Sequence, residues 1–65
     1  MEISEFEGKK VTIEYRDENG NGQLVTGTLN GSTNSGDLQI TWEHNKKKGM
    51  MWIPIDNLTS IEEVD

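Results

Sequence analysis

The residues with the clearest potential for chemistry are a run of three lysines and a single histidine. The run, Lys46-Lys47-Lys48, could contact phosphate, or it could be a soluble hairpin tip that discourages edge pairing. His44 stands beside Glu43, and no serine, cysteine or second histidine accompanies it in a pattern typical of a triad or a metal site. We therefore expect no catalytic residues and a protein that is not an enzyme.

Asp17-x-Asn19-x-Asn21-Gly22 matches the first half of a calcium-binding loop, which places oxygen ligands at alternate positions and glycine at the sixth. The twelfth position is Thr28, where a bidentate glutamate is required. A hairpin turn accounts for the same residues, because Asn-Gly steps tolerate positive φ. The chain also has no cysteine, which excludes disulfides and thiolate metal sites. We expect no metal and no cofactor.

Trp52 is the leading candidate for a binding residue. Strand alternation predicts that it faces away from the core, with Met50 on the same side and Thr41 opposite. Tryptophan is enriched at binding hot spots, and an exposed apolar patch indicates an interaction site. Coverage of Trp52 by the N-terminal segment, through Phe6, is the alternative interpretation.

Charge points to a partner class. The formal net charge is −6 and the chain has one arginine, which disfavours non-specific nucleic-acid binding. Three carboxylates lie near each end of the chain, and the two groups could form one negative surface: Glu2, Glu5 and Glu7, and Glu62, Glu63 and Asp65. Such a surface would steer toward a basic partner, although solubility explains it equally well.

The elements that position these residues are short strands. Alternating apolar residues predict strands over 11–16, 38–43 and 50–55, and 23–29 is β-prone with a bulge or bend expected at Gly27. A polar loop is expected over 30–37, and a tight turn at Asp56-Asn57-Leu58 precedes a short last strand containing Ile61. Phe6 is expected to cover one end of the core. The length predicts a single domain over 1–65.

The register of the second hairpin follows from the apolar pattern. A four-residue connection, Asn45 to Lys48, pairs Leu38 with Ile55, Ile40 with Ile53, and Trp42 with Met51, and it keeps all six on one face. A slip of one residue either way splits the apolar set between two faces.

Two segments carry a resemblance to known small barrels: Gly8-Lys9-Lys10-Val11-Thr12-Ile13-Glu14-Tyr15 and Ile53-Pro54-Ile55-Asp56-Asn57-Leu58-Thr59-Ser60-Ile61. The order of strands and turns resembles SH3-like and Sm-like proteins, and the second segment is similar to the closing strands of YolD-like proteins. The resemblance implies an all-β fold, a small five-stranded SH3-like (Sm-like) barrel with a short N-terminal segment. The chain departs from Sm proteins in lacking their split RNA-binding motif.

These observations favour a non-catalytic module that binds a protein, with Trp52, Met50, Glu62, Glu63, Glu5 and Glu7 as contact residues. A specific version is a phage-type inhibitor of a nucleic-acid-binding protein. The alternative is an Sm-like binder of single-stranded nucleic acid that uses Lys46, Lys47 and Lys48 with Tyr15 or Trp52 for stacking. A homo-oligomer is compatible with either.

The first seven residues are acidic where a secretion signal would be basic, and no apolar stretch approaches the ~20 residues of a membrane span. We therefore expect a cytoplasmic protein without membrane contact.

Overall fold

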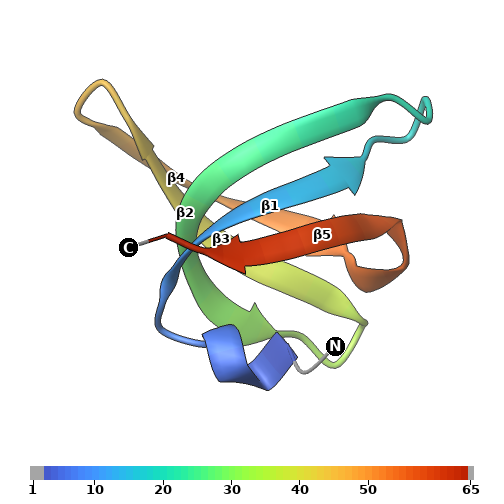
Figure 1. The fold of residues 1–65 in the computed structure, drawn as a ribbon, viewed down its shortest axis with the longest axis horizontal. Coiled ribbons are helices and arrows are strands. Elements are labelled where there is room, and N and C mark those ends of the chain that lie inside the picture. The colour runs from blue at the N-terminus through green and yellow to red at the C-terminus, as the bar shows by residue number, and fades with distance from the viewer. Residues whose placement is uncertain (1–2, 65) are drawn as a thin grey trace.

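The computed structural model describes residues 3–64 and shows an all-β protein with five antiparallel strands in one sheet (Figure 1). The strand order is β4-β3-β2-β1-β5. The elements in chain order are η1 (Ile3–Phe6), β1 (Lys10–Arg16), β2 (Gly22–Ser32), β3 (Asp37–His44), β4 (Lys47–Pro54), η2 (Ile55–Asn57) and β5 (Leu58–Glu63), where η marks a 3-10 helix. Among these residues no helix is long and apolar enough to cross a membrane.

Strand β2 joins the two halves of the sheet. Its residues 22–28 pair with β1 and its residues 27–32 pair with β3, so Gly27 and Thr28 have neighbours on both sides. The strand curves strongly along its length (Figure 1). A Cβ at Gly27 would collide with the backbone oxygen of Thr41, so the close approach of β3 requires glycine here. The bend expected at Gly27 is confirmed as the point where β2 passes from one neighbour to the other.

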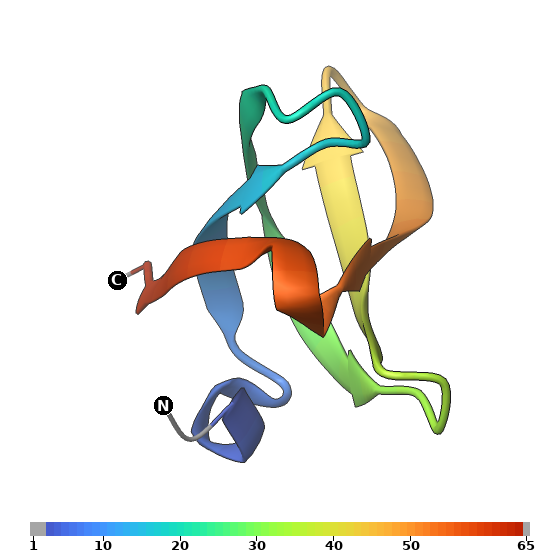
Figure 2. The ribbon, with the colours of Figure 1, turned by 90° about the vertical axis from the view of Figure 1, so that its right-hand side faces the viewer.

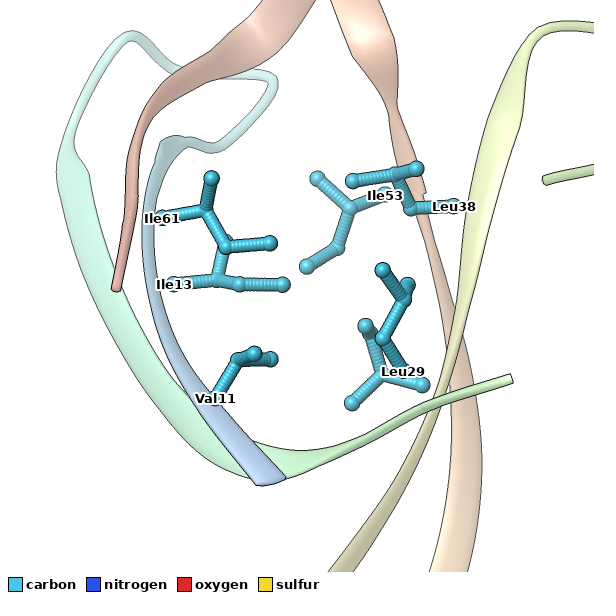
Figure 3. Packing of buried hydrophobic residues seen from close by; sticks show 7 residues of the cluster. Val11, Ile13, Leu29, Leu38, Ile53 and Ile61 are labelled. Carbon is cyan, nitrogen blue, oxygen red and sulfur yellow. The ribbon is translucent and has the colours of Figure 1, made fainter. Parts of the chain in front are cut away.

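The core lies in the concavity of this bent sheet. Seven apolar side chains are buried: Val11, Ile13, Leu29, Leu38, Ile40, Ile53 and Ile61. Those labelled in Figure 3 point toward one another from the β1–β5 side and from the β2–β3–β4 side. The inward positions of Val11, Ile13, Leu38, Ile40 and Ile53 are those that strand alternation predicts, whereas the sequence does not predict a buried face for Leu29 or Ile61. No buried polar side chain accompanies them in the described part of the chain.

The N-terminal segment closes one end of this core. Residues Ile3–Phe6 form the 3-10 turn η1, and Ile3 and Phe6 pack against the buried cluster. The amide of Gly8 donates to the carbonyl of Leu29, which ties the segment to β2. The expectation that Phe6 covers an end of the core is therefore confirmed.

The predicted register of the second hairpin is wrong by two residues. Leu38 pairs with Ile53, Ile40 with Met51, and Trp42 with Gly49. The connection is a two-residue turn, Asn45-Lys46, in which both residues have positive φ (51° and 67°). Such turns match the twist of the flanking strands, so the strands continue to the turn. A shift of two residues keeps every side chain on its predicted face, which is why the apolar pattern could not detect it.

Two boundaries also differ from prediction. Strand β2 continues through Asn30 to Ser32 with a bulge between Leu29 and Gly31, so the loop expected over 30–37 is reduced to the turn 33–36. Ile55 is not part of β4 but begins η2 and is 37 % exposed. Its amide donates to Gly36, which turns the chain toward β5.

The edges of the sheet are β4 and β5, and each pairs with one neighbour only. The sheet is thus open between them, and closure into a barrel is not shown. The turn of β3–β4 and the N-terminal 3-10 helix lie at opposite ends of the molecule (Figures 1 and 2).

Candidate binding surface

Trp52 and Met50 form an exposed apolar patch on the outer face of β4. Trp52 is 53 % exposed and Met50 is 49 % exposed, and they lie opposite Gln39 and Thr41 of β3. Their neighbours Met51 and Ile53 point inward and are half-buried or buried. Phe6 packs on the core, so the exposure of Trp52 favours the binding interpretation over coverage by the N-terminal segment. We call Trp52 and Met50 the aromatic patch.

The three lysines do not form one compact tip. Lys46 lies in the turn, whereas Lys47 and Lys48 are successive strand residues, whose side chains leave opposite faces of the sheet. Lys48 approaches Glu43 across the hairpin with 3.7 Å between Nζ and Oε2, and both side chains are largely exposed. Lys48 therefore lies on the same face as the aromatic patch, two residues before Met50.

The carboxylates at the two chain ends occupy different parts of the fold. Glu62 and Glu63 belong to β5, where they pair with Thr12 and Val11 of β1, and both are exposed. Glu63 also forms an ion pair with Lys9 at 3.3 Å, which offsets part of its charge. Because β5 and β4 are the two opposite edges of the strand order, these carboxylates and the aromatic patch are on different strands with no pairing between them.

The N-terminal carboxylates lie beside η1. Glu5 is within this 3-10 helix and Glu7 follows it, and both are exposed. The Glu7 carboxylate reaches toward Gly31 at the end of β2. Glu2 and Asp65, which were predicted to belong to the same surface, lie outside the described residues.

Tyr15 is partly buried against the core rather than standing free. It pairs with Gln23 of β2 and Leu58 of β5 near the end of β1 that is remote from the lysines (Figure 1). The structure therefore does not bring Tyr15 and Lys46–Lys48 together, and Trp52 is the only one of the two proposed stacking residues on the lysine-bearing strand.

A shallow depression of about 420 Å³ lies on the outer face next to the aromatic patch. Its lining spans four strands: Lys10, Thr26, Gly27, Thr28, Thr41, Glu43 and Lys48. Its polar residues are three threonines, two lysines and one glutamate, and the Thr41 hydroxyl accepts a hydrogen bond from Asn30 Nδ2 at 2.7 Å. The sequence does not predict this feature, because Thr41 of β3 joins Thr26 and Thr28 of β2 only through the pairing of the two strands.

The half-motif for calcium is used within a turn. Asp17 Oδ1 accepts from the amides of Asn19 and Asn21, and its Oδ2 accepts from Gln23 Nε2 at 3.0 Å. The amide of Asn21, then the side chain of Gln23, lowers the pKa of this carboxyl below its ordinary value. Both oxygens thus stabilise the β1–β2 turn, which supports the hairpin interpretation. His44 is exposed at the end of β3, opposite Lys47.

Comparisons with known proteins give no relative. No protein-family profile, no curated protein and no solved structure matches the chain.

Proposed function

We propose that the chain is a non-catalytic, cytoplasmic binding module that recognises a protein through the aromatic patch. The observation that carries this proposal is the 53 % exposure of Trp52 beside an equally open Met50 on an edge strand. A domain of 65 residues has few apolar side chains with which to form its core, so leaving these two in water has a cost. Burial against a partner would recover it, since large apolar side chains contribute about 1.5–3 kcal/mol each when fully covered.

The carboxylates support a basic partner in this proposal. Glu5, Glu7 and Glu62 are exposed and make no ion pair among the described side chains. They would act at a distance, by raising the rate of encounter, while the aromatic patch makes the contact. A phage-type inhibitor of a nucleic-acid-binding protein is one form that such a module would take, because the partner's basic surface then attracts it.

We also propose that the sheet belongs to the class of small SH3-like or Sm-like barrels. A five-stranded sheet with a strongly bent second strand and a single 3-10 turn between its last two strands is consistent with the small SH3-like and Sm-like barrels.

The test is affinity capture from the native host with three forms of the chain: the natural sequence, Trp52→Ala and Leu24→Ala. Leu24 is 69 % exposed on β2 and serves as the matched control for removing an exposed apolar side chain. We expect Trp52→Ala to lose a specific protein that Leu24→Ala retains. Equal recovery with all three forms would refute the role of the patch.

Single-stranded nucleic acid is a second candidate ligand, favoured by one observation. Lys48, Met50 and Trp52 occupy alternate positions on the outer face of one strand, so successive side chains lie about 6.8 Å apart. A cation followed by a stacking ring is the arrangement that single-strand binders use. Titration of labelled RNA and DNA at low salt tests it: binding that weakens with added salt and with Lys48→Gln supports this ligand, and no binding at low salt excludes it.

A further inference from the structure

The exposed edge of β4 carries unpaired backbone groups. Because the β3–β4 turn has two residues, His44 and Lys47 form a hydrogen-bonded pair, and bonded positions then alternate along the strand. Lys47, Gly49, Met51 and Ile53 therefore bond to β3, whereas the amides and carbonyls of Lys48, Met50 and Trp52 point away from the sheet. Pro54, which has no amide, falls on an outward position, as edge prolines do.

The middle of this edge lacks the usual protection against pairing. Lys47 and Lys48 at one end and Pro54 at the other discourage pairing, but Gly49–Ile53 contains no lysine, no proline and no charged residue. The other edge, β5, is different. It carries Glu62 and Glu63, and its pairing with β1 is interrupted by a register shift at Glu14/Tyr15. Of the two edges in the described part of the chain, β4 is the one that carries an uncharged apolar segment, Gly49–Ile53, with outward-pointing backbone donors and acceptors.

We propose that β4 pairs antiparallel with β4 of a second copy of this chain, with the two-fold axis at Met50. Outward-pointing residues must pair with outward-pointing residues, so Met50 meets Met50 of the partner subunit, and Trp52 meets Lys48 of the partner subunit. This register forms about six backbone hydrogen bonds between subunits. Moving the two-fold axis to Met51 would set Lys48 against Pro54, whose missing amide leaves the pair incomplete.

The charge distribution favours a second copy as the occupant. Antiparallel pairing places the two lysine-bearing ends far apart, and each Lys48 is brought over the Trp52 ring of the other subunit, a cation–π arrangement. Glu62 and Glu63 lie on β5, the opposite edge, so the acidic groups of the two subunits stay remote from the junction. The arrangement is a closed two-fold dimer, the commonest symmetric assembly.

This inference deepens the proposed function and rests on it in one respect, that the aromatic patch is the partner-binding surface. Pairing extends the sheet without covering its outer face, so Trp52 and Met50 of both subunits would form one continuous stripe. The dimer would present a contact area that neither subunit has alone, flanked at both ends by lysines.

The experiment is sedimentation of the purified chain from about 10 μM to about 1 mM, with amide hydrogen exchange at both limits. We expect a monomer–dimer equilibrium. With rising concentration, the amides of Met50 and Trp52 should gain protection. Gly49 and Met51, which already bond to β3, should change little.

Three variants make the result specific. Met50→Lys sets like charges opposite each other at the two-fold axis and should abolish the dimer. Leu24→Lys makes the same charge change at an exposed position on β2 and should leave the dimer intact. Met50→Pro removes one outward amide without touching β3, and it should also give a monomer.

A chain that stays monomeric throughout, a dimer insensitive to Met50→Lys, or a larger ring with protected β5 amides would each overturn the inference. None of these outcomes affects capture of a partner at low concentration, so the proposed function stands or fails separately.

Discussion

The close approach of two strands at Gly27 makes a quantitative prediction for Gly27→Ala. The added methyl group would meet the Thr41 carbonyl, Thr41 C at 3.1 Å and Ile40 Cγ2 at 3.0 Å. Two of these three atoms are backbone, so β3 must shift or β2 must straighten. Forced overpacking of this kind costs about 1–3 kcal/mol, and it outweighs the gain of up to about 1 kcal/mol that alanine normally brings to a strand.

The net loss is therefore about 1–2 kcal/mol from a total that is about 3–10 kcal/mol for a chain of this length. Urea denaturation followed by tryptophan fluorescence measures it. For a small protein the free energy falls by about 1 kcal/mol per molar urea, so the midpoint should drop by about 1–2 M.

Gly22→Ala is the control, because Gly22 begins the same strand and a Cβ there meets nothing within 4 Å. Its midpoint should stay level or rise. A Gly27→Ala midpoint equal to or above that of Gly22→Ala would refute the argument that β3 requires glycine at the crossing.

Two further predictions concern the turn and the patch. The pKa of Asp17 is lowered in the folded state, so its carboxylate stabilises the protein fully above the ordinary pKa of 3.8, and this contribution is lost as pH falls through the folded pKa. Asp17→Ala should therefore reduce the loss of stability in acid, whereas Glu18→Ala should not. Urea midpoints at pH 7 and pH 3 measure the difference. Trp52→Ala should change the unfolding free energy by no more than about 0.5 kcal/mol, because about half of the indole is exposed to water. Ile40→Ala, which removes a fully buried side chain, should cost about 2–5 kcal/mol in the same denaturation assay. A similarly large loss with Trp52→Ala would show that the ring is structural.

The parts of the fold that the sequence predicted are those governed by alternation. Burial follows the predicted faces of β1, β3 and β4, because a strand with one side in the core must repeat every two residues. The register of β3–β4 escaped prediction because Asn45-Lys46 is not a typical turn pair. Lysine at positive φ is uncommon, so a longer connection was the natural expectation.

The part of the candidate site that could be predicted from the sequence is the part that lies on a single strand. Trp52 and Met50 share an outward face through their spacing alone, and their exposure is confirmed. The depression beside them needed three-dimensional information, since Thr26, Thr28 and Thr41 come together only through the pairing of β2 with β3. The separation of the acidic β5 edge from β4 likewise follows from strand order, which alternation does not encode.

The shared strand β2 has a consequence for how the chain reaches its native state. Each hairpin, β1–β2 and β3–β4, closes through a short turn and involves residues near in sequence, so each is expected to form early. β2 also pairs with β3 through the short turn 33–36, so among the described strands the pairing of β1 with β5, which sets Val11 opposite Glu63, is the one between segments distant in sequence. Because the chain must close this long loop before β5 can pair, we expect the β1–β5 contact to limit the folding rate in spite of the small size of the protein.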